Sequence, residues 1–179
     1  VTRPTELVMD QTCCETYDSN YGILELYWAP LLQKEHLDKK NAISTNLANV
    51  IMLQSGPLEI QENKDVKATV LVSSSEKAWR EQAEGLMLNP LMIEVPEDKT
   101  LMGKQNLMVL LEGEFKSAFD SAPASLTKDQ GDYSISNHLS KSSQPGKIIV
   151  AGSSAITGPM VFPSDASSGI ALLIVNAID

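Results

Sequence analysis

The sequence is poor in the residues that most enzymes and metal proteins use for chemistry. Its 179 residues include two histidines and two cysteines. The cysteines are neighbours, Cys13 and Cys14, so they form no disulfide framework and do not reveal a redox compartment. Such a pair can bind a soft metal or act in redox chemistry, but two small buried side chains are the favoured interpretation. We therefore predict no cofactor, no metal site and no catalytic residue.

Basic residues are also scarce: 14 Lys and Arg stand against 23 Asp and Glu, and the formal net charge is −9. A nucleic-acid interface needs concentrated positive charge, so we expect none, nor a basic patch for an anionic membrane. No stretch is long and apolar enough to cross a bilayer, and no signal peptide is visible. The start at Val1 and the closing "ALLIVNAID" lead us to expect a piece of a longer protein.

The chain does have enough apolar residues, 42% of the total, for one folded domain with a core. Three segments are almost continuously apolar, which is typical of parallel strands covered on both faces. They are residues 66–72, 107–111 and 147–151. After the first, Ser73 and Glu76 have the spacing of a capping box, which predicts a helix. We therefore expect one α/β domain over residues 1–179, with a layered, mainly parallel sheet and flanking helices.

Other segments complete this expected layout. Residues 5–11 read as a strand, and residues 23–29 as a strand or a short helix. Residues 116–145 hold many Ser, Pro, Asp and Gly without periodicity, which predicts a long surface loop. Residues 167–179 begin with serines and continue as an apolar run, which predicts a C-terminal helix.

The segment "GKIIVAGSSAITG" looks most like a functional motif, because a strand ends there in glycine and hydroxyl side chains. A phosphate-binding loop needs a Lys after its second glycine, but Pro159 follows Gly158. A nucleophile elbow needs a second glycine where Ile156 stands, and a histidine later in the chain. We therefore predict a structural turn in which Ser153 and Ser154 hydrogen-bond to nearby backbone groups.

A second candidate is the pair of acids in "LLEGEF". Glu112 and Glu114 are two residues apart, so on a strand they would share a face, and paired carboxylates can do acid–base work. The alternative interpretation, which we favour, is two solvated acids at a strand end. With Ser153 and Ser154, these acids make up our candidate ligand or partner loop residues.

The order of several segments resembles a known family. The segments are "ELVMDQTC", "VLVSSSEKAW", "VLLEGEFKSAF", "SQPGKIIVAGSSAI" and "SSGIALLIVNAID". They are similar to the GldG-like auxiliary component of gliding-motility-type ABC transport systems. "LLEGEFKSAF" and the Pro-Gly-Lys-Ile-Ile-Val run are the most specific parts. The sequence departs from the family where acids usually follow the glycine, because Ser153, Ser154 and Ala155 stand there.

The resemblance implies a class I glutamine amidotransferase-like, flavodoxin-like domain without the catalytic cysteine. It implies a place on the extracytoplasmic, periplasmic face of the cytoplasmic membrane, held by anchors that this chain lacks. It also implies ABC permease and ATPase subunits as partners. Our leading hypothesis is therefore a non-catalytic interaction domain of an ABC transporter auxiliary protein. The alternatives are a sugar- or peptide-binding α/β domain and a degenerate hydrolase.

Overall fold

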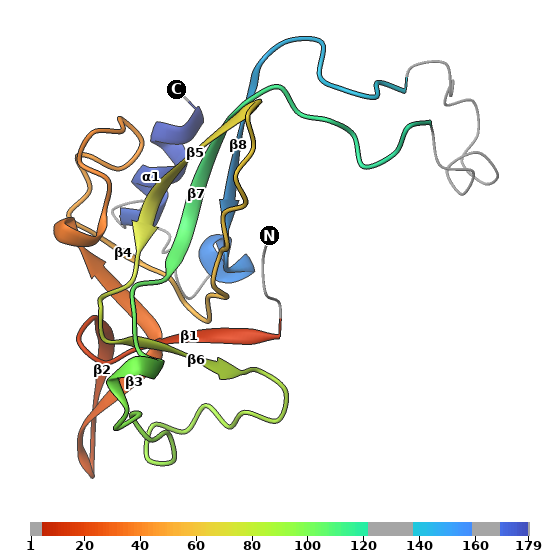
Figure 1. Ribbon diagram of the computed structural model, residues 1–179. Helices are drawn as coiled ribbons and strands as arrows, with labels where there is room; N and C mark the ends of the chain where they lie inside the picture. The colour runs from red at the N-terminus through yellow and green to blue at the C-terminus, as the bar shows by residue number, and fades with distance from the viewer. Residues whose placement is uncertain (1–4, 122–137, 159–168, 179) are drawn as a thin grey trace, which may run out of the picture.

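The protein folds mainly as β-strands in three small sheets, with one α-helix among the residues described (Figure 1). The computed structural model describes residues 5–121, 138–158 and 169–178. The strands are β1 (Glu6–Asp10), β2 (Cys14–Ser19), β3 (Gly22–Gln33), β4 (Asn49–Ile51), β5 (Val66–Ser73), β6 (Ala78–Gln82), β7 (Asn106–Gly113) and β8 (Gly146–Ala151). The helices are α1 (Gly169–Ile178) and the short 3-10 turns η1 (Lys34–His36), η2 (Lys99–Leu101) and η5 (Ser154–Thr157).

The three apolar segments lie side by side in one sheet, as expected, but the predicted parallel arrangement is wrong. The sheet has the order β5-β7-β8, and both neighbouring pairs are antiparallel. A parallel pair needs a crossover connection, usually a helix, on one face of the sheet. Here β5 leads into β6, in another sheet, and β7 leads through a long excursion back to β8. The layered α/β, flavodoxin- or amidotransferase-like architecture is therefore corrected to small antiparallel sheets.

The prediction of a helix after Ser73 is also wrong, because a strand forms there instead. β6 pairs antiparallel with β1, and Trp79 lies opposite Met9 in the register. The serines do not cap a helix: the backbone N–H and the hydroxyl of Ser75 donate to the buried carboxylate of Asp10. Local capping signals are worth about 1 kcal/mol, and this long-range network with the burial of Trp79 outweighs them.

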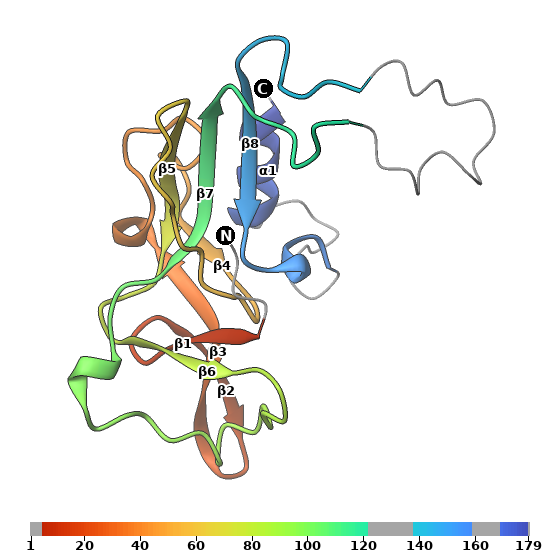
Figure 2. The same cartoon turned by 45° about the vertical axis from the view of Figure 1, so that its right-hand side comes forward.

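β2 and β3 form a hairpin that projects below the crossing pair of β1 and β6 (Figures 1 and 2). A two-residue turn, Asn20–Tyr21, connects Ser19 to Gly22. Gly22 has a φ of +98°, which side chains rarely adopt, and the Ser19 hydroxyl donates to its carbonyl. The far end of β3 pairs with β4, so the hairpin continues into the body of the domain.

Two apolar clusters hold the domain together. The larger one joins the β5-β7-β8 sheet to α1 and β4, with Met108 and Leu110 packed in the same cluster as Ile170 and Leu173. Figure 2 shows α1 behind β8, on one face of this sheet. The smaller cluster centres on Trp79, which is packed with Met9, Trp28 and Ala29 at the base of the hairpin. One face of the β5-β7-β8 sheet, here called the upper sheet, is therefore part of the core.

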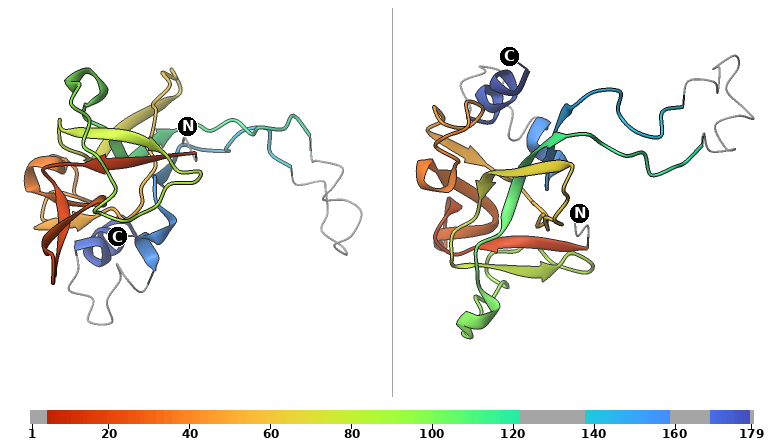
Figure 3. Two further views of the ribbon diagram at one scale, coloured as in Figure 1. Left: turned by 90° about the horizontal axis from the view of Figure 1, so that it is seen from below. Right: turned by 45° about the horizontal axis from the view of Figure 1, so that its top comes forward.

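The C-terminal helix is confirmed over Gly169–Ile178, whereas the serines expected to cap it lie outside the described residues. The described ends of the predicted 116–145 loop run alongside each other away from the sheet (Figure 3). Lys116 and Lys141 form a bridge there, and the Ser117 amide donates to the Ser140 carbonyl. The centre of that loop, residues 122–137, lies outside the description.

Candidate functional site

A groove with a mainly apolar lining lies on the β5-β7-β8 sheet. Its volume is about 270 Å³. Alternate residues of a strand face opposite sides of a sheet, so Val109 and Leu111 point away from the side that Met108 and Leu110 occupy. Ten residues line the groove: Leu58, Glu59, Ile60, Gln61, Asn63, Val66, Val109, Leu111, Phe115 and Val150.

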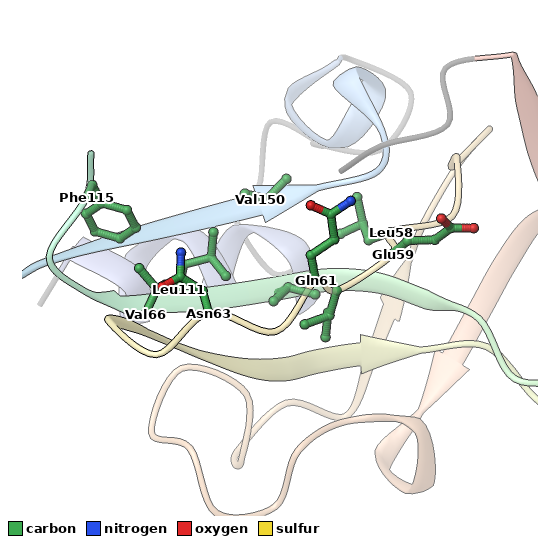
Figure 4. Close-up of a pocket in the computed structure, with 10 residues that line it drawn as sticks. Leu58, Glu59, Gln61, Asn63, Val66, Leu111, Phe115 and Val150 are labelled. Carbon is green, nitrogen blue, oxygen red and sulfur yellow. The ribbon is translucent and has the colours of Figure 1, made fainter. Parts of the chain in front are cut away.

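The extended segment 58–63 forms the opposite wall of the groove and is held at both ends. The Leu58 amide donates to the Asn106 carbonyl, and the Asn106 side chain donates back to the Leu58 carbonyl. Beyond the segment, the Glu114 amide donates to the Asp65 carbonyl. Figure 4 shows Phe115 at one end of the groove and Leu58 at the other. Hydrogen bonds therefore fix this wall at both ends, and the groove is present without a ligand.

The lining has few polar groups, and most of them already have partners. The carboxylate of Glu59 forms an ion pair with Arg80, 3.1 Å away. The side-chain oxygen of Asn63 accepts a hydrogen bond from the Asp65 amide. The groove is smaller than typical sites for drug-sized ligands and contains no His, Cys or Ser. It suits one or two apolar side chains and is poorly suited to a sugar.

The two acids of "LLEGEF" lie at one end of this sheet, and each is beside a lysine. Glu112 lies 3.6 Å from the amine of Lys147, and Glu114 lies 3.6 Å from that of Lys141. Glu112 is the more covered of the two, yet its side chain keeps a third of its surface exposed. The pairs are surface ion pairs, which stabilise proteins only slightly.

Ser153 lies at the opposite end of the sheet, where β8 ends. Its hydroxyl donates to the Leu53 carbonyl and accepts from the Ala155 amide, so it caps η5. Gly152 lies against another backbone segment, because a Cβ there would be 2.0 Å from the Gly56 carbonyl oxygen. Ser154 is exposed. The contacts of Ser153 agree with the predicted turn, and the backbone hydrogen bond predicted for Ser154 stays a prediction.

The structure therefore does not bring the four candidate residues together. β8 runs antiparallel to β7, so its first residue, Gly146, lies opposite Gly113 and its last, Ala151, opposite Met108. Five residue steps, roughly 17 Å, separate the two ends of β8, with the two acids near one end and the two serines beyond the other. No joint ligand loop can form from them.

A cysteine–histidine contact, which the sequence did not predict, lies near the end of β1. The Cys13 sulfur is 3.1 Å from Nε2 of His36. An activated nucleophile would need a lowered thiol pKa. Burial instead raises the pKa of Cys13, and the nearby carboxylates of Asp10 and Glu35 raise it further. The thiol is therefore neutral near pH 7 and is not an activated nucleophile.

Within the described residues, no group of three or more His, Cys, Asp or Glu side chains could hold a metal ion. None of the helices described there is long and apolar enough to span a membrane.

Cys14 lies beside Glu25, whereas Cys13 packs against the larger cluster and contacts His36. The adjacent cysteines thus have different surroundings.

Three features were missed in the sequence: the groove, the Cys13–His36 contact and the hairpin. The hairpin had a signal, since Ser-Asn-Tyr-Gly is rich in turn residues and separates two alternating segments. The other two depend on residues far apart in the chain and have no local signal. His36, for example, lies 23 residues from its partner Cys13.

The fold and groove define a β-rich domain with antiparallel sheets whose open face is apolar and carries no assembled catalytic set in the described residues. Comparison with protein families identifies it further. Residues 6–165 match the ABC transport auxiliary family, described as an ABC-type uncharacterized transport system, and the chain belongs to that family. No curated protein and no solved structure matches the chain.

Proposed function

We propose that this chain is the non-catalytic interaction domain of an ABC transport auxiliary protein and acts on the extracytoplasmic side of the membrane. The family match over residues 6–165 carries the proposal, because an auxiliary component works by association with the other transport components. The neutral Cys13 thiol and the separated serines and acids agree with a role in binding. The resemblance to gliding-motility-type systems suggests a permease and an ATPase as the partners.

Co-purification tests the association. The full-length protein, expressed with the permease and the ATPase of its system, is expected to remain bound to them after detergent solubilisation. An unrelated permease and ATPase pair serves as the control. Recovery of the protein without either component would overturn the proposed function.

Thiol labelling tests the location. Both native cysteines are replaced by serine, and the exposed Lys64 is replaced by cysteine. A membrane-impermeant maleimide is expected to label Lys64→Cys in intact spheroplasts as strongly as in lysed ones. Labelling that appears only after lysis would place the domain in the cytoplasm.

Peptide binding is a second candidate function, favoured by the apolar, pinned groove. A fluorescence titration with short apolar peptides tests it, and Ile60→Lys at the groove is expected to abolish the binding. Leu172→Lys is the control, because Leu172 is a similarly exposed apolar residue of α1, which packs against the other face of the sheet. Equal binding by both variants would exclude the groove.

A further inference from the structure

The tip of the β2–β3 hairpin exposes large apolar and aromatic side chains of a kind that proteins usually bury. Tyr17, Tyr21 and Ile23 are 60%, 83% and 73% exposed. The hairpin is well ordered by its own contacts: its strands pair from Glu15–Leu26 to Ser19–Gly22. The aromatic side chains are therefore presented on a rigid element and not on a loose loop.

The connection between β6 and β7, residues 83–103, adds a second exposed apolar group at the same end of the molecule. Its Met87, Leu91, Met92 and Leu101 are all more than half exposed. Figures 1 and 2 both place this connection beside the hairpin. Of the fourteen large exposed hydrophobic side chains described, half lie on these two segments.

The two segments are parts of one body, because both pack on the smaller apolar cluster. Residues from the base of the hairpin, such as Tyr27, and from the connection, such as Leu88 and Val95, contact that cluster. The ring of Tyr27 lies 5.5 Å from that of Trp79. We call the exposed side chains of residues 17–23, which lie on both faces of the hairpin, and of residues 87–101 the hairpin–connection surface.

The two segments that carry this surface are also acidic. Residues 14–33 contain Glu15, Asp18 and Glu25 and no basic residue. Residues 83–103 contain four acids, Glu84, Glu94, Glu97 and Asp98, against one lysine, Lys99. Two segments that make up less than a quarter of the chain thus carry a net charge of −6 out of −9.

The composition selects among possible occupants. An anionic lipid surface attracts basic segments and repels this one. A second copy would bring the same carboxylates face to face, because a two-fold interface joins identical patches. Tyr and Met are enriched in protein–protein interfaces, whereas charged side chains are depleted from the interface core and belong at its polar rim. An acidic surface rich in Tyr and Met therefore complements a protein with basic and apolar side chains.

We propose that the hairpin–connection surface is the docking surface of this domain for a basic, apolar protein surface on the transport components. The inference rests on the proposed function and names the part of the domain that carries it out. Tyr21 and Ile23 are the anchors, and the carboxylates fix the orientation and speed the encounter.

Binding of the full-length protein to the detergent-solubilised permease–ATPase complex tests the proposal. Tyr21→Ser and Ile23→Ser are each expected to weaken the affinity by about tenfold or more. Phe119→Ser, a similarly exposed aromatic outside this surface, is the matched control and is expected to bind as the wild type does. Circular dichroism of each variant verifies that the fold is retained.

Charge reversal tests the electrostatic part. Asp18→Lys with Glu94→Lys is expected to slow association by about tenfold at low salt, and added salt is expected to reduce the difference. Glu62→Lys with Glu76→Lys, two exposed acids elsewhere, is the control with the same change in net charge. Equal slowing by both pairs would show an effect of net charge and overturn the specific docking.

The outcomes separate the two proposals. Absence of wild-type binding would overturn the proposed function and this inference together. Wild-type binding that Tyr21→Ser and Ile23→Ser leave unchanged would overturn this inference alone. Flotation with phosphatidylcholine–phosphatidylglycerol vesicles, or a concentration-dependent dimer, that is lost in Tyr21→Ser would instead assign the surface to lipid or to a second copy and also overturn it.

Discussion

The carboxylate of Asp10 accepts two hydrogen bonds from Ser75, one from its backbone N–H and one from its hydroxyl, both 2.7 Å long. Asp10 is fully buried and also accepts from the backbone N–H groups of Thr12 and Cys13. Asp10 ends β1, and Ser75 lies just before β6. This contact therefore fixes where two strands that are far apart in the sequence begin to pair.

Asp10→Ala is expected to lower the free energy of unfolding by about 3 kcal/mol or more, because it leaves several buried donors without an acceptor. Ser75→Ala removes one donor and is expected to cost about 1 to 2 kcal/mol. Urea denaturation measures both. Asp18→Ala, at an exposed position of the hairpin, is the control and is expected to change stability by less than about 0.5 kcal/mol. Equal stability of Asp10→Ala and Asp18→Ala would contradict the role of the network.

The sequence predicted where the strands of the upper sheet lie but not their direction. Apolar runs at 66–72 and 107–111 became β5 and β7, because the sheet is covered by α1 on one face and partly by segment 58–63 on the other. The run at 147–151 became β8, which ends the strand order and has no fully buried residue, so its expected coverage on both faces is wrong. Burial on both faces gives the same pattern in parallel and antiparallel sheets. Direction depends on the connections, and their paths are set by contacts such as Asp10–Ser75.

The candidate residues were partly foreseeable for a similar reason. The turn at Ser153 follows from local chemistry, since a serine after a strand can cap the next turn. The separation of Ser153 from Glu112 depends on the antiparallel pairing of β7 and β8. The groove needs the segment 58–63 to run alongside β7, and nothing in that segment's own sequence encodes this path.

Gly152 is expected to tolerate no side chain, because a Cβ would lie 2.0 Å from the Gly56 carbonyl oxygen, which belongs to the backbone. Gly152→Ala should lower the free energy of unfolding by at least about 2 kcal/mol. Gly146→Ala, at the start of β8, is the matched control, since the nearest atom to its Cβ would be 3.8 Å away. A thermal or urea melt of both variants measures the difference. Similar stabilities would show that the two backbone segments can move apart.

The hydroxyl groups after Gly152 are expected to act in structure alone. Ser153→Ala removes the hydrogen bond to the Leu53 carbonyl and the cap on Ala155, at a cost of about 1 kcal/mol. Ser154→Ala, at an exposed position, should change stability by less than about 0.5 kcal/mol. Calorimetric titration of the double variant and the wild type with nucleotide or divalent metal should give no heat of binding. Micromolar affinity that the double variant loses would identify a ligand site.

The ion pairs of Glu112 and Glu114 should contribute little, because all four side chains remain partly exposed to water. Glu112→Gln and Glu114→Gln are each expected to change the free energy of unfolding by about 0.5 kcal/mol or less. The small effect should shrink further in high salt, since the charges are screened. A destabilisation of several kcal/mol that persists in high salt would show that the carboxylates do more than pair with Lys147 and Lys141.

The carboxylate of Glu25 is expected to control two titrations at the base of the hairpin. Burial raises the pKa of Cys14 to about 11, and the negative charge of Glu25 is the next largest cause. The hydroxyl of Tyr27 donates to Glu25 over 2.7 Å, which is the largest cause of a Tyr27 pKa of about 12. Glu25→Gln should therefore lower the pKa of both groups, and Glu15→Gln, a neighbouring acid that contributes to neither shift, should not.

The same shifts set the sign of the alkaline stability change. The folded pKa of Cys14 lies above its ordinary value of 9.0, so between about pH 9 and 11 the folded chain holds more protons than the unfolded chain. The contribution of the Cys14 thiol to the free energy of unfolding is therefore fully present below about pH 9 and is lost as the pH rises through about 11. The raised pKa of Tyr27 extends this loss of stability toward about pH 12. Urea unfolding at a series of alkaline pH values measures the fall, which Cys14→Ser should reduce.

In a Cys13→Ser background, iodoacetamide should modify Cys14 slowly until the pH approaches 11. Rapid modification near pH 8 would show that the thiol is not held in its neutral form.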